Sequence, residues 1–341
     1  MTSSLWQSRP MHEPVLRVED LRAEFRIRAE WYPAVDGVSF TVDRNETLAL
    51  VGESGCGKSV TALSIMGLVP QPQGRVSADC ILLDGMDLRT LDEAGFEALR
   101  GDRMTMIFQE PMTSLNPVMN IGAQVAEALR IHRDLSRADS EAKALAVLEE
   151  VKIPSAKQRF HDYPHQFSGG MRQRVMIAMA LACEPTLLLA DEPTTALDVT
   201  IQAQVLGLLA DLKARHGMAM LFITHNLGVV AQIADRVAVM YAGQVVEEAP
   251  VHEIFARPAH PYTRALFSAI PRMDRAEQTL AAIPGRVPPL NDMPRGCRFA
   301  PRCPLRRSGC EAPQVLAAAA PGHLARCHVA TGAVARELAR A

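Results

Sequence analysis

The sequence of 341 residues predicts an α/β fold built on a mostly parallel, doubly wound sheet. Two observations lead to this prediction. A phosphate-binding loop motif, Gly52 to Ser59, lies between an apolar run typical of a strand and a run with helical spacing. Short apolar runs then alternate with helical patterns between residues 186 and 241, as expected where helices connect parallel strands.

The spacing of apolar residues predicts each element in turn. Alternation predicts antiparallel strands at 16–27 and 34–47, followed by a hairpin around Asp84-Gly85. Between residues 115 and 182, apolar residues recur at intervals of three and four, which indicates a helical region. The alternating part is expected to contain strand 186–190, helix 201–215, strand 218–224, helix 227–234 and strand 237–241.

The phosphate-loop motif predicts a site for a nucleoside triphosphate with magnesium. It reads Gly52, Glu53, Ser54, Gly55, Cys56, Gly57, Lys58 and Ser59. Glycines allow consecutive backbone N–H groups to surround phosphate oxygens, and the N-terminus of the following helix adds partial positive charge. We expect Lys58 to reach the terminal phosphates and the Ser59 hydroxyl to coordinate Mg²⁺. The alternative is a glycine-rich surface turn.

Two adjacent carboxylates end the apolar run that begins at residue 187. Asp191 is placed to hold Mg²⁺, usually through water. Glu192 faces the other way and is the candidate to orient or deprotonate an attacking water. The alternative is a buried strand that merely ends at the solvent.

Composition argues against nucleic-acid binding, a membrane span and secretion. Lys and Arg total 36 and Asp and Glu total 38, so the net charge of −2 offers no electrostatic footprint for nucleic acid. The apolar stretch 175–183 is far shorter than the ~20 residues of a membrane span. Residues 1–15 lack the apolar core of a secretory signal, so we expect a cytoplasmic protein with seven cysteines that do not form disulfides.

Further motifs follow the phosphate loop in a fixed order: Gln109, Ser168-Gly169-Gly170, Asp191-Glu192, Ala196-Leu197-Asp198 and His225. Together they resemble the ATP-binding cassette (ABC) family over residues 15–255. The resemblance implies a P-loop NTPase domain at 12–255, with an antiparallel β subdomain and a helical subdomain at about 112–183. It also implies an irregular, cysteine-containing C-terminal domain at 256–341.

The resemblance assigns a role to each matching residue. It makes Gln109 a ligand that senses the metal and the γ-phosphate, Asp198 part of the D-loop, and His225 a contact of the γ-phosphate. Ser168, Gly169 and Gly170 match the signature loop, which closes over a nucleotide held by the other subunit of a dimer.

An aromatic residue of the first strand usually stacks on adenine in this family. Phe25 occupies that place by count, and Trp31 or Tyr32 could serve instead.

Three runs narrow the resemblance to the ATPase subunits of oligopeptide and dipeptide importers: 163–174, 191–200 and His260-Pro261-Tyr262-Thr263. That group implies a second ATPase subunit that is a paralogue, two membrane permeases and a substrate-binding protein. It also implies a peripheral position on the cytoplasmic face of the inner membrane. Import of nickel, glutathione or another small solute is the alternative, and a soluble ABC ATPase without a transport role is disfavoured.

Four cysteines cluster near the C-terminus, Cys297, Cys303, Cys310 and Cys327, in a segment where Pro284–Pro321 contains eight prolines. Regular helices are not expected there. Clustered cysteines in a reducing compartment favour a metal over disulfides. Their loose spacing, Cys303-Pro304 and six arginines at 286–307 favour an iron–sulfur cluster, with zinc, or cysteines that bind no metal, as the alternatives. The importer resemblance also implies a [4Fe-4S] centre that stabilises the segment.

Overall fold

The computed structural model describes residues 13–109, 114–195, 197–269 and 283–332. The chain divides into two compact units, which are described separately. Unit 1 comprises residues 1–41, 48–85 and 224–341, and unit 2 comprises residues 42–47 and 86–223. In the described part of the chain, no helix has both the length and the apolar character needed to span a membrane.

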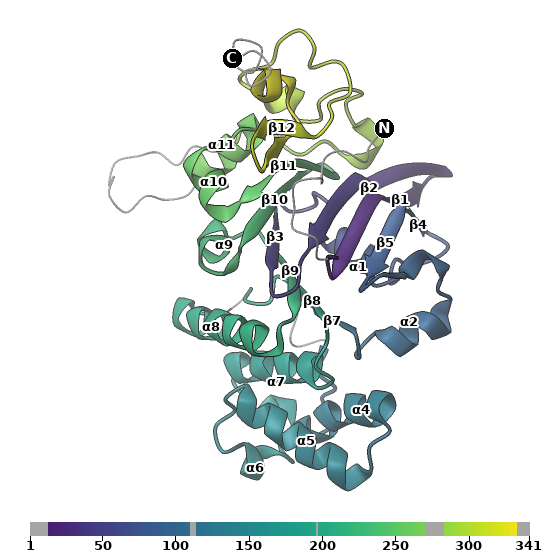
Figure 1. Cartoon of the computed structure of the whole chain (residues 1–341), viewed down its shortest axis with the longest axis vertical. Helices are drawn as coiled ribbons and strands as arrows, with labels where there is room; N and C mark the ends of the chain where they lie inside the picture. Colours follow the sequence, from purple (N-terminus) through teal and green to yellow (C-terminus); the bar gives the residue numbers. More distant parts are fainter. Residues whose placement is uncertain (1–12, 110–113, 196, 270–282, 333–341) are drawn as a thin grey trace. The chain divides into compact units, whose positions relative to one another are not determined.

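Unit 1 begins with antiparallel strands, as predicted. They are β1 (Leu16–Ile27), β2 (Glu30–Val42), β4 (Gly74–Ser77) and β5 (Cys80–Leu83) (Figure 1). β1 pairs with both β4 and β5. The predicted strand 34–47 ends earlier, at Val42, because residues 43–46 turn and Asn45 adopts a positive φ of 60°.

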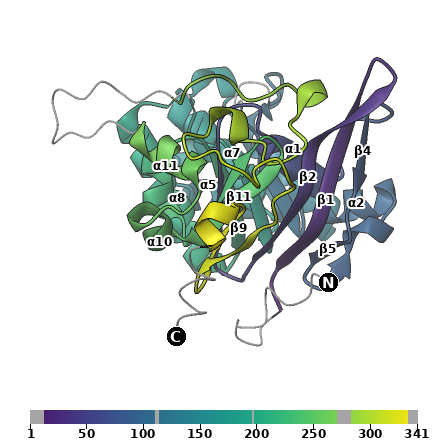
Figure 2. The same ribbon diagram turned by 90° about the horizontal axis from the view of Figure 1, so that it is seen from above.

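Unit 1 also contains the strand that precedes the phosphate loop. β3 (Thr47–Val51) pairs in parallel with β10 (Arg236–Tyr241), and β11 (Gln244–Pro250) pairs antiparallel with β10. β13 (His323–Ala325) extends this sheet from β11, and β12 (Ala317–Ala320) pairs with β13. The C-terminal segment, yellow in Figures 1 and 2, therefore lies alongside β11.

Short helices complete unit 1: α1 (Lys58–Ile65), α9 (Leu227–Ile233), α10 (Val251–Ala256), α11 (Pro261–Ser268), and the 3₁₀ turns η3 (Leu290–Asp292) and η4 (Ala300–Arg302). Three aromatic rings join these parts in the core. The ring centroids of Tyr241 and Tyr262 are 4.6 Å apart, and Phe299 lies 5.3 Å from Tyr241. Residues of the C-terminal segment therefore share a core with β10.

Unit 2 carries three parallel strands: β7 (Met104–Ile107), β8 (Leu187–Asp191) and β9 (Ala219–Thr224), whose last residue belongs to unit 1. Its other elements are β6 (Met86–Asp87), η1 (Leu88–Thr90), α2 (Glu93–Leu99), α4 (Ile121–Arg133), α5 (Arg137–Glu150), α6 (Ala156–Arg159), η2 (Pro164–Gln166), α7 (Gly169–Leu181) and α8 (Val199–His216). The helical region predicted for 115–182 is present. α7 packs against α4 and α5 (Figure 1).

Of the elements for which the sequence predicted bounds, all but the strand at 34–47 fall within two residues of those bounds, and the predicted α/β fold is confirmed. The prediction that Pro284–Pro321 forms no regular helix also agrees with the structure, whose only helical elements in the described residues 284–321 are the 3₁₀ turns η3 and η4. Sequence patterns missed β11, β12 and β13; β12 is four alanines, and β13 has only three residues. The predicted domain boundary at residue 255 stays a prediction, and its start at residue 12 lies outside the described residues.

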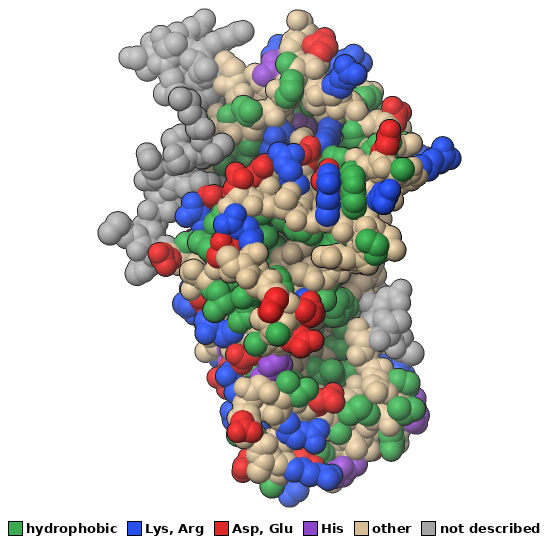
Figure 3. All heavy atoms as spheres, turned by 90° about the vertical axis from the view of Figure 1, so that its right-hand side faces the viewer, with side chains coloured by type: hydrophobic (Ala, Val, Ile, Leu, Met, Phe, Trp, Pro, Cys, Tyr) green, Lys and Arg blue, Asp and Glu red, His purple; other side chains and the backbone are tan. Residues whose placement is uncertain are grey.

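Charged side chains of both signs are mixed on the face drawn in Figure 3. This distribution agrees with the nearly balanced composition, whose formal net charge is −2.

Candidate functional site

The phosphate loop has the strand and helix context that its motif requires. β3 ends at Val51, and α1 begins at Lys58, as the sequence predicts. The Lys58 ammonium is buried and donates to the carbonyl oxygens of Gly52 and Glu53, at 2.9 and 3.1 Å. Ser54 and Gly55 are exposed at the tip of the loop. The loop therefore folds around the lysine that is predicted to bind phosphate.

Glycine is required at two positions where the loop touches other backbone. A Cβ atom at Gly52 would lie 2.1 Å from the carbonyl oxygen of Met240, and one at Gly57 would lie 2.6 Å from that of Ala34. Neither distance can accommodate a side chain without movement of the backbone. Between these glycines, Cys56 is buried, and burial raises the pKa of its thiol. These close contacts fix the course of the loop.

Residues far away in the sequence hold Glu53, the second residue of the loop. Its backbone N–H donates to the hydroxyl of Tyr262, and its carboxylate accepts two hydrogen bonds from Arg302. The sequence analysis did not find these contacts. The run His260-Pro261-Tyr262-Thr263 marked the family group but gave no sign of contact with the phosphate loop.

Unit 2 brings together two of the predicted catalytic residues. Asp191 is the last residue of β8 and is buried, and Glu192 follows it with a positive φ of 47°. The amide nitrogen of Gln109 donates to Glu192 Oε2 at 3.2 Å, and the Thr195 hydroxyl donates to the same oxygen at 2.9 Å. A non-glycine residue at positive φ is uncommon and is concentrated at functional sites. These contacts fix the direction of the Glu192 carboxylate.

The predicted signature loop forms the start of α7. Ser168 is the N-cap, and its hydroxyl accepts a hydrogen bond from the backbone N–H of Met171 at 3.4 Å. A Cβ at Gly170 would lie 2.5 Å from Ile201 Cγ2, whereas one at Gly169 would have no other residue of the described ranges within 4 Å outside its chain neighbours and helix backbone. The loop is thus packed on one side and open on the other.

Two further predicted residues lie at helix starts. Asp198 is the N-cap of α8, and its carboxylate accepts a hydrogen bond from the Ile201 N–H at 2.9 Å. Ala196 of the same motif lies outside the described residues. His225 directly follows β9 and is exposed. The roles assigned to Asp198 and His225 stay predictions.

The three aromatic candidates for adenine stacking are all in unit 1. Phe25 lies on β1 opposite Gly74 of β4. The guanidinium of Arg75 lies 4.5 Å from the ring centroid of Trp31, and Tyr32 donates to Glu30 at 2.5 Å. The assignment of one of them to adenine stays a prediction.

The four clustered cysteines line one cavity of about 10 Å³, roughly the size of a water molecule. Cys310 and Cys327 are buried, and burial raises the pKa of Cys297 and of Cys303. Nevertheless, in the described part of the chain no group of three or more His, Cys, Asp or Glu side chains is arranged to hold a metal ion. The structure gathers the predicted ligands but does not support the predicted metal site.

Two sequence profiles of known families match the chain. The family described as "ABC transporter" matches residues 35–195, and the one described as "Oligopeptide/dipeptide transporter, C-terminal region" matches residues 246–310. The first range holds the phosphate loop and the signature loop, and the second holds Tyr262 and Arg302. Three of the four clustered cysteines also lie in the second range.

Similar proteins cover nearly the whole chain. The oligopeptide transport ATP-binding protein AppD of Bacillus subtilis (strain 168) is 52% identical over 296 residues, which are 87% of this chain and 90% of AppD. A relative from Brucella abortus (strain 2308), named as a peptide import ATP-binding protein, is 53% identical over 311 residues, 88% of this chain and 92% of that protein. This chain belongs to the ABC transporter family. Within the family it is an ATP-binding subunit of the oligopeptide/dipeptide group, and this ABC subunit is an ATPase.

Solved structures confirm the fold of the ABC subunit. The dimeric post-hydrolysis state of the ATP-binding cassette MJ0796, bound to ADP and Pi, matches it with a TM-score of 0.60 and 26% identity, over 69% of this chain and 98% of that one. The cbiO1 protein from Clostridium perfringens matches with a TM-score of 0.62 over 72% of this chain and 92% of that one, at 24% identity.

Proposed function

We propose that this ABC subunit hydrolyses ATP to power the uptake of di- or oligopeptides. The observation that carries the proposal is the match of residues 246–310 to the oligopeptide/dipeptide transporter region, supported by the names of AppD and of the Brucella abortus relative. The proposed partners are two membrane permeases, a substrate-binding protein and a second ABC ATPase that is a paralogue. The subunit would bind the permeases at the cytoplasmic face of the inner membrane.

Reconstitution tests the substrate. The subunit is co-purified with its membrane partners, inserted into vesicles with ATP on the side of the ATPase, and supplied with the binding protein and labelled peptides. We expect ATP-dependent peptide accumulation that fails in a matched Glu192→Gln complex. Accumulation of nickel or glutathione without any uptake of peptide would refute the peptide assignment.

The proposed chemistry is transfer of the γ-phosphoryl group to water. Lys58 would exchange its two backbone carbonyl partners for phosphate oxygens, which are stronger, charged acceptors. The Ser59 hydroxyl, the buried Asp191 carboxylate and the Gln109 side chain supply oxygen donors, the ligand type that Mg²⁺ prefers. Bound Mg²⁺ would neutralise charge that develops on the phosphates. Around the loop, Gly52, Ser54, Gly55, Cys56 and Gly57 would offer backbone N–H groups to the phosphates.

Glu192 is the proposed group that orients or deprotonates the attacking water. The support is its place directly after Asp191 and the two donors, Gln109 and Thr195, that fix its carboxylate. His225 would contact the γ-phosphate from its exposed position after β9. Phe25 is proposed to stack on adenine, with Trp31 and Tyr32 as alternatives.

The second half of each nucleotide site is proposed to come from the other ATPase subunit. The dimeric cassette that matches this fold supports this proposal, as does the open space beside Gly169. Ser168, Gly169 and Gly170 would then bind the γ-phosphate held by the partner, and Asp198 would lie near the same junction. An isolated monomer should hydrolyse ATP poorly, and concentration-independent turnover by a monomer would contradict the shared site.

We further propose that Cys297, Cys303, Cys310 and Cys327 hold a [4Fe-4S] cluster, with Zn²⁺ as the alternative. Thiols are the ligands that iron–sulfur clusters take, and the four cysteines line one cavity. Because that cavity is small, binding requires the thiols to move apart. Anaerobic purification with metal analysis and visible spectroscopy tests the proposal. Stoichiometric zinc without iron would refute the cluster, and a metal-free protein would refute both.

A further inference from the structure

The C-terminal segment contacts the phosphate loop directly, through Glu53. The Tyr262 hydroxyl accepts a hydrogen bond from the Glu53 backbone N–H at 2.9 Å. Arg302 donates to both carboxylate oxygens of Glu53, at 2.9 and 3.1 Å. Tyr262 lies 209 positions, and Arg302 249 positions, from the loop residue that they hold. The motif that defines the loop does not require these contacts, because position 53 is a variable position in it.

The Arg302 side chain is buried and makes several hydrogen bonds, unlike the arginine of a typical surface ion pair. It is only 6% exposed. The guanidinium also donates to the carbonyl oxygen of Pro284 at 2.8 Å and to the Tyr241 hydroxyl at 3.3 Å. Its central carbon lies 5.7 Å from the ring centroid of Tyr241 and 6.0 Å from that of Phe299. A bidentate arginine–carboxylate pair with this burial fixes the position of both side chains.

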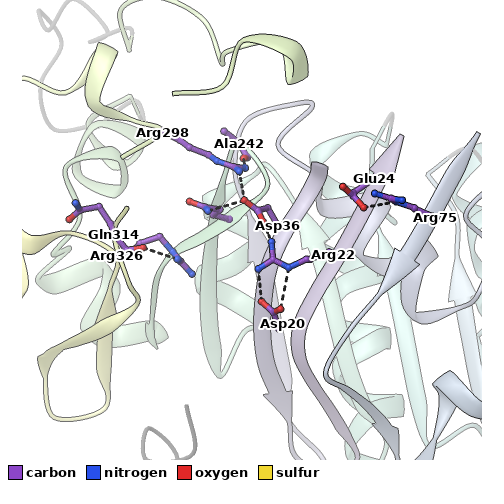
Figure 4. Close-up of polar contacts among 10 residues, drawn as sticks. Asp20, Arg22, Glu24, Asp36, Arg75, Ala242, Arg298, Gln314 and Arg326 are labelled. Atoms are coloured by element: carbon purple, nitrogen blue, oxygen red, sulfur yellow. Dashed lines mark hydrogen bonds and ion pairs between the residues drawn. The ribbon is translucent and has the colours of Figure 1, made fainter. Parts of the chain in front are cut away.

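Arg298 provides a second connection from the same segment (Figure 4). It bonds the carboxylate of Asp36 and the carbonyl oxygen of Ala242. The next residue, Gly243, donates its N–H to the carbonyl oxygen of Cys56 in the phosphate loop at 2.9 Å. The N–H of Asp36 in turn donates to the carbonyl oxygen of Gly243 at 2.8 Å. The turn between β10 and β11 is thus fixed against the loop by Arg298.

We propose that Tyr262, Arg298 and Arg302 form a brace that positions the phosphate loop for nucleotide binding. The inference rests on the proposed nucleotide site at residues 52–59. The brace acts at both halves of the loop, on Glu53 directly and on Cys56 through Gly243. Backbone N–H groups bind phosphate only when they point at it, so a loop that is fixed before binding loses less entropy when the nucleotide arrives. Nucleotide affinity therefore depends on the C-terminal segment.

A double-mutant cycle on the full-length subunit tests the brace. The probe is N-methylanthraniloyl-ATP with Mg²⁺, and the readout is its Kd. We expect Arg302→Gln and Glu53→Gln each to raise the Kd about tenfold. The double variant should be within about twofold of either single variant, because both changes remove the same ion pair. Arg302→Lys should recover part of the affinity, since it keeps the charge but loses the two parallel hydrogen bonds.

The matched control is Arg307→Gln, an exposed arginine five positions further along the segment, whose Kd should stay within about twofold of wild type. In the assembled transporter, Arg302→Gln should raise the KM for ATP about tenfold and leave kcat within about twofold. A rise in KM with kcat unchanged is expected for a positioning role, whereas a general loss of folded protein would lower the apparent kcat. If Arg302→Gln fails to fold, Tyr262→Phe removes a single oxygen atom and should raise the Kd about threefold.

Lys58→Ala distinguishes a failure of the brace from a failure of the proposed nucleotide site. If Lys58→Ala weakens binding but Arg302→Gln and Tyr262→Phe both bind within about twofold of wild type, the brace is refuted and the nucleotide site stands. If Lys58→Ala binds the probe as wild type does, the nucleotide site is wrong and the brace is refuted with it.

Discussion

The phosphate loop and the signature loop are both predicted to bind the γ-phosphate of ATP, yet they differ in how closely they pack against the rest of the chain. Gly52 and Gly57 press against the backbone of other segments, and the Lys58 ammonium is buried. In the signature loop, Ser168 and Gly169 are exposed, and a Cβ at Gly169 would meet no atom of the described residues within 4 Å beyond its chain neighbours and its own helix backbone. One loop is complete within its own chain, and the other is open.

This difference indicates which half of the chemistry a single subunit can perform. A loop fixed by its own chain can bind phosphate without a partner, because its N–H groups are already oriented. An open loop at a helix N-terminus has anion-binding potential that its own chain does not use. We therefore expect nucleotide binding to depend on residues of unit 1 and turnover to depend on unit 2 and a second subunit.

The largest effect is expected for Glu192→Gln, which separates binding from turnover. The change keeps the shape and the contact with Thr195 but removes the negative charge and the base. The ATPase rate of the assembled transporter should fall about a hundredfold or more, while the Kd for nucleotide stays within a few-fold of wild type. A near wild-type rate would show that Glu192 is not the base.

Lys58→Ala should weaken nucleotide binding by the phosphate loop. Removal of the ammonium takes a full positive charge from the loop, so the Kd for ATP should rise about tenfold or more. Nucleotide titration of the isolated subunit measures this without the partner. The thermal midpoint without nucleotide checks that the variant folds, because Lys58 also bonds the Gly52 and Glu53 carbonyls. An unchanged Kd would contradict the view that the loop binds alone.

The sequence predicted the strand and the helix on either side of the phosphate-loop motif correctly, because these elements are local. A strand, a glycine-rich loop and a helix are adjacent in the chain, so their residue types are readable at fixed spacing. Ser168 and Asp198 also act locally, since their side chains cap the helices that directly follow them. Strands and helices with regular apolar periods were also placed closely.

Long-range contacts could not be read in this way. Arg302 and Tyr262 reach Glu53 across more than two hundred residues, and no spacing rule links an arginine in a proline-rich segment to a loop residue. β12 is four alanines, which carry no alternation that would indicate a strand. The cysteine cluster shows a second limit of prediction from sequence, one that concerns geometry and not long-range contact. Its spacing suggested ligands, but whether four thiols can hold a metal depends on distances that the sequence does not contain.

Two adjacent glycines allow a matched test of the open loop. Gly170→Ala would place a Cβ 2.5 Å from Ile201 Cγ2, so we expect a loss of about 1–3 kcal/mol in unfolding free energy from the strained contact between α7 and α8. The new methyl group of Gly169→Ala makes no close contact with the described residues, so this variant should leave the unfolding free energy unchanged within about 0.5 kcal/mol.

The ATPase rate of the assembled transporter then tests whether the exposed side of the signature loop faces the partner's nucleotide. Gly169→Ala should lower it several-fold, because a new methyl group would stand where the partner's nucleotide approaches. Equal activity of Gly169→Ala and wild type would mean that the open side of the signature loop does not face a nucleotide.

The smallest expected effect concerns how firmly unit 2 holds its own catalytic group. Thr195→Val keeps the side-chain shape and removes the hydroxyl that donates to Glu192 Oε2 at 2.9 Å. Because Gln109 still donates to the same oxygen, the carboxylate should lose only part of its orientation. We expect kcat of the assembled transporter to fall about two- to fivefold, with the KM for ATP unchanged. The matched control is Thr200→Val, which removes an exposed hydroxyl at the start of α8 and should leave kcat unchanged. A KM effect without a kcat effect would show that Thr195 supports nucleotide binding and not the orientation of Glu192, which would contradict the separation of binding from turnover.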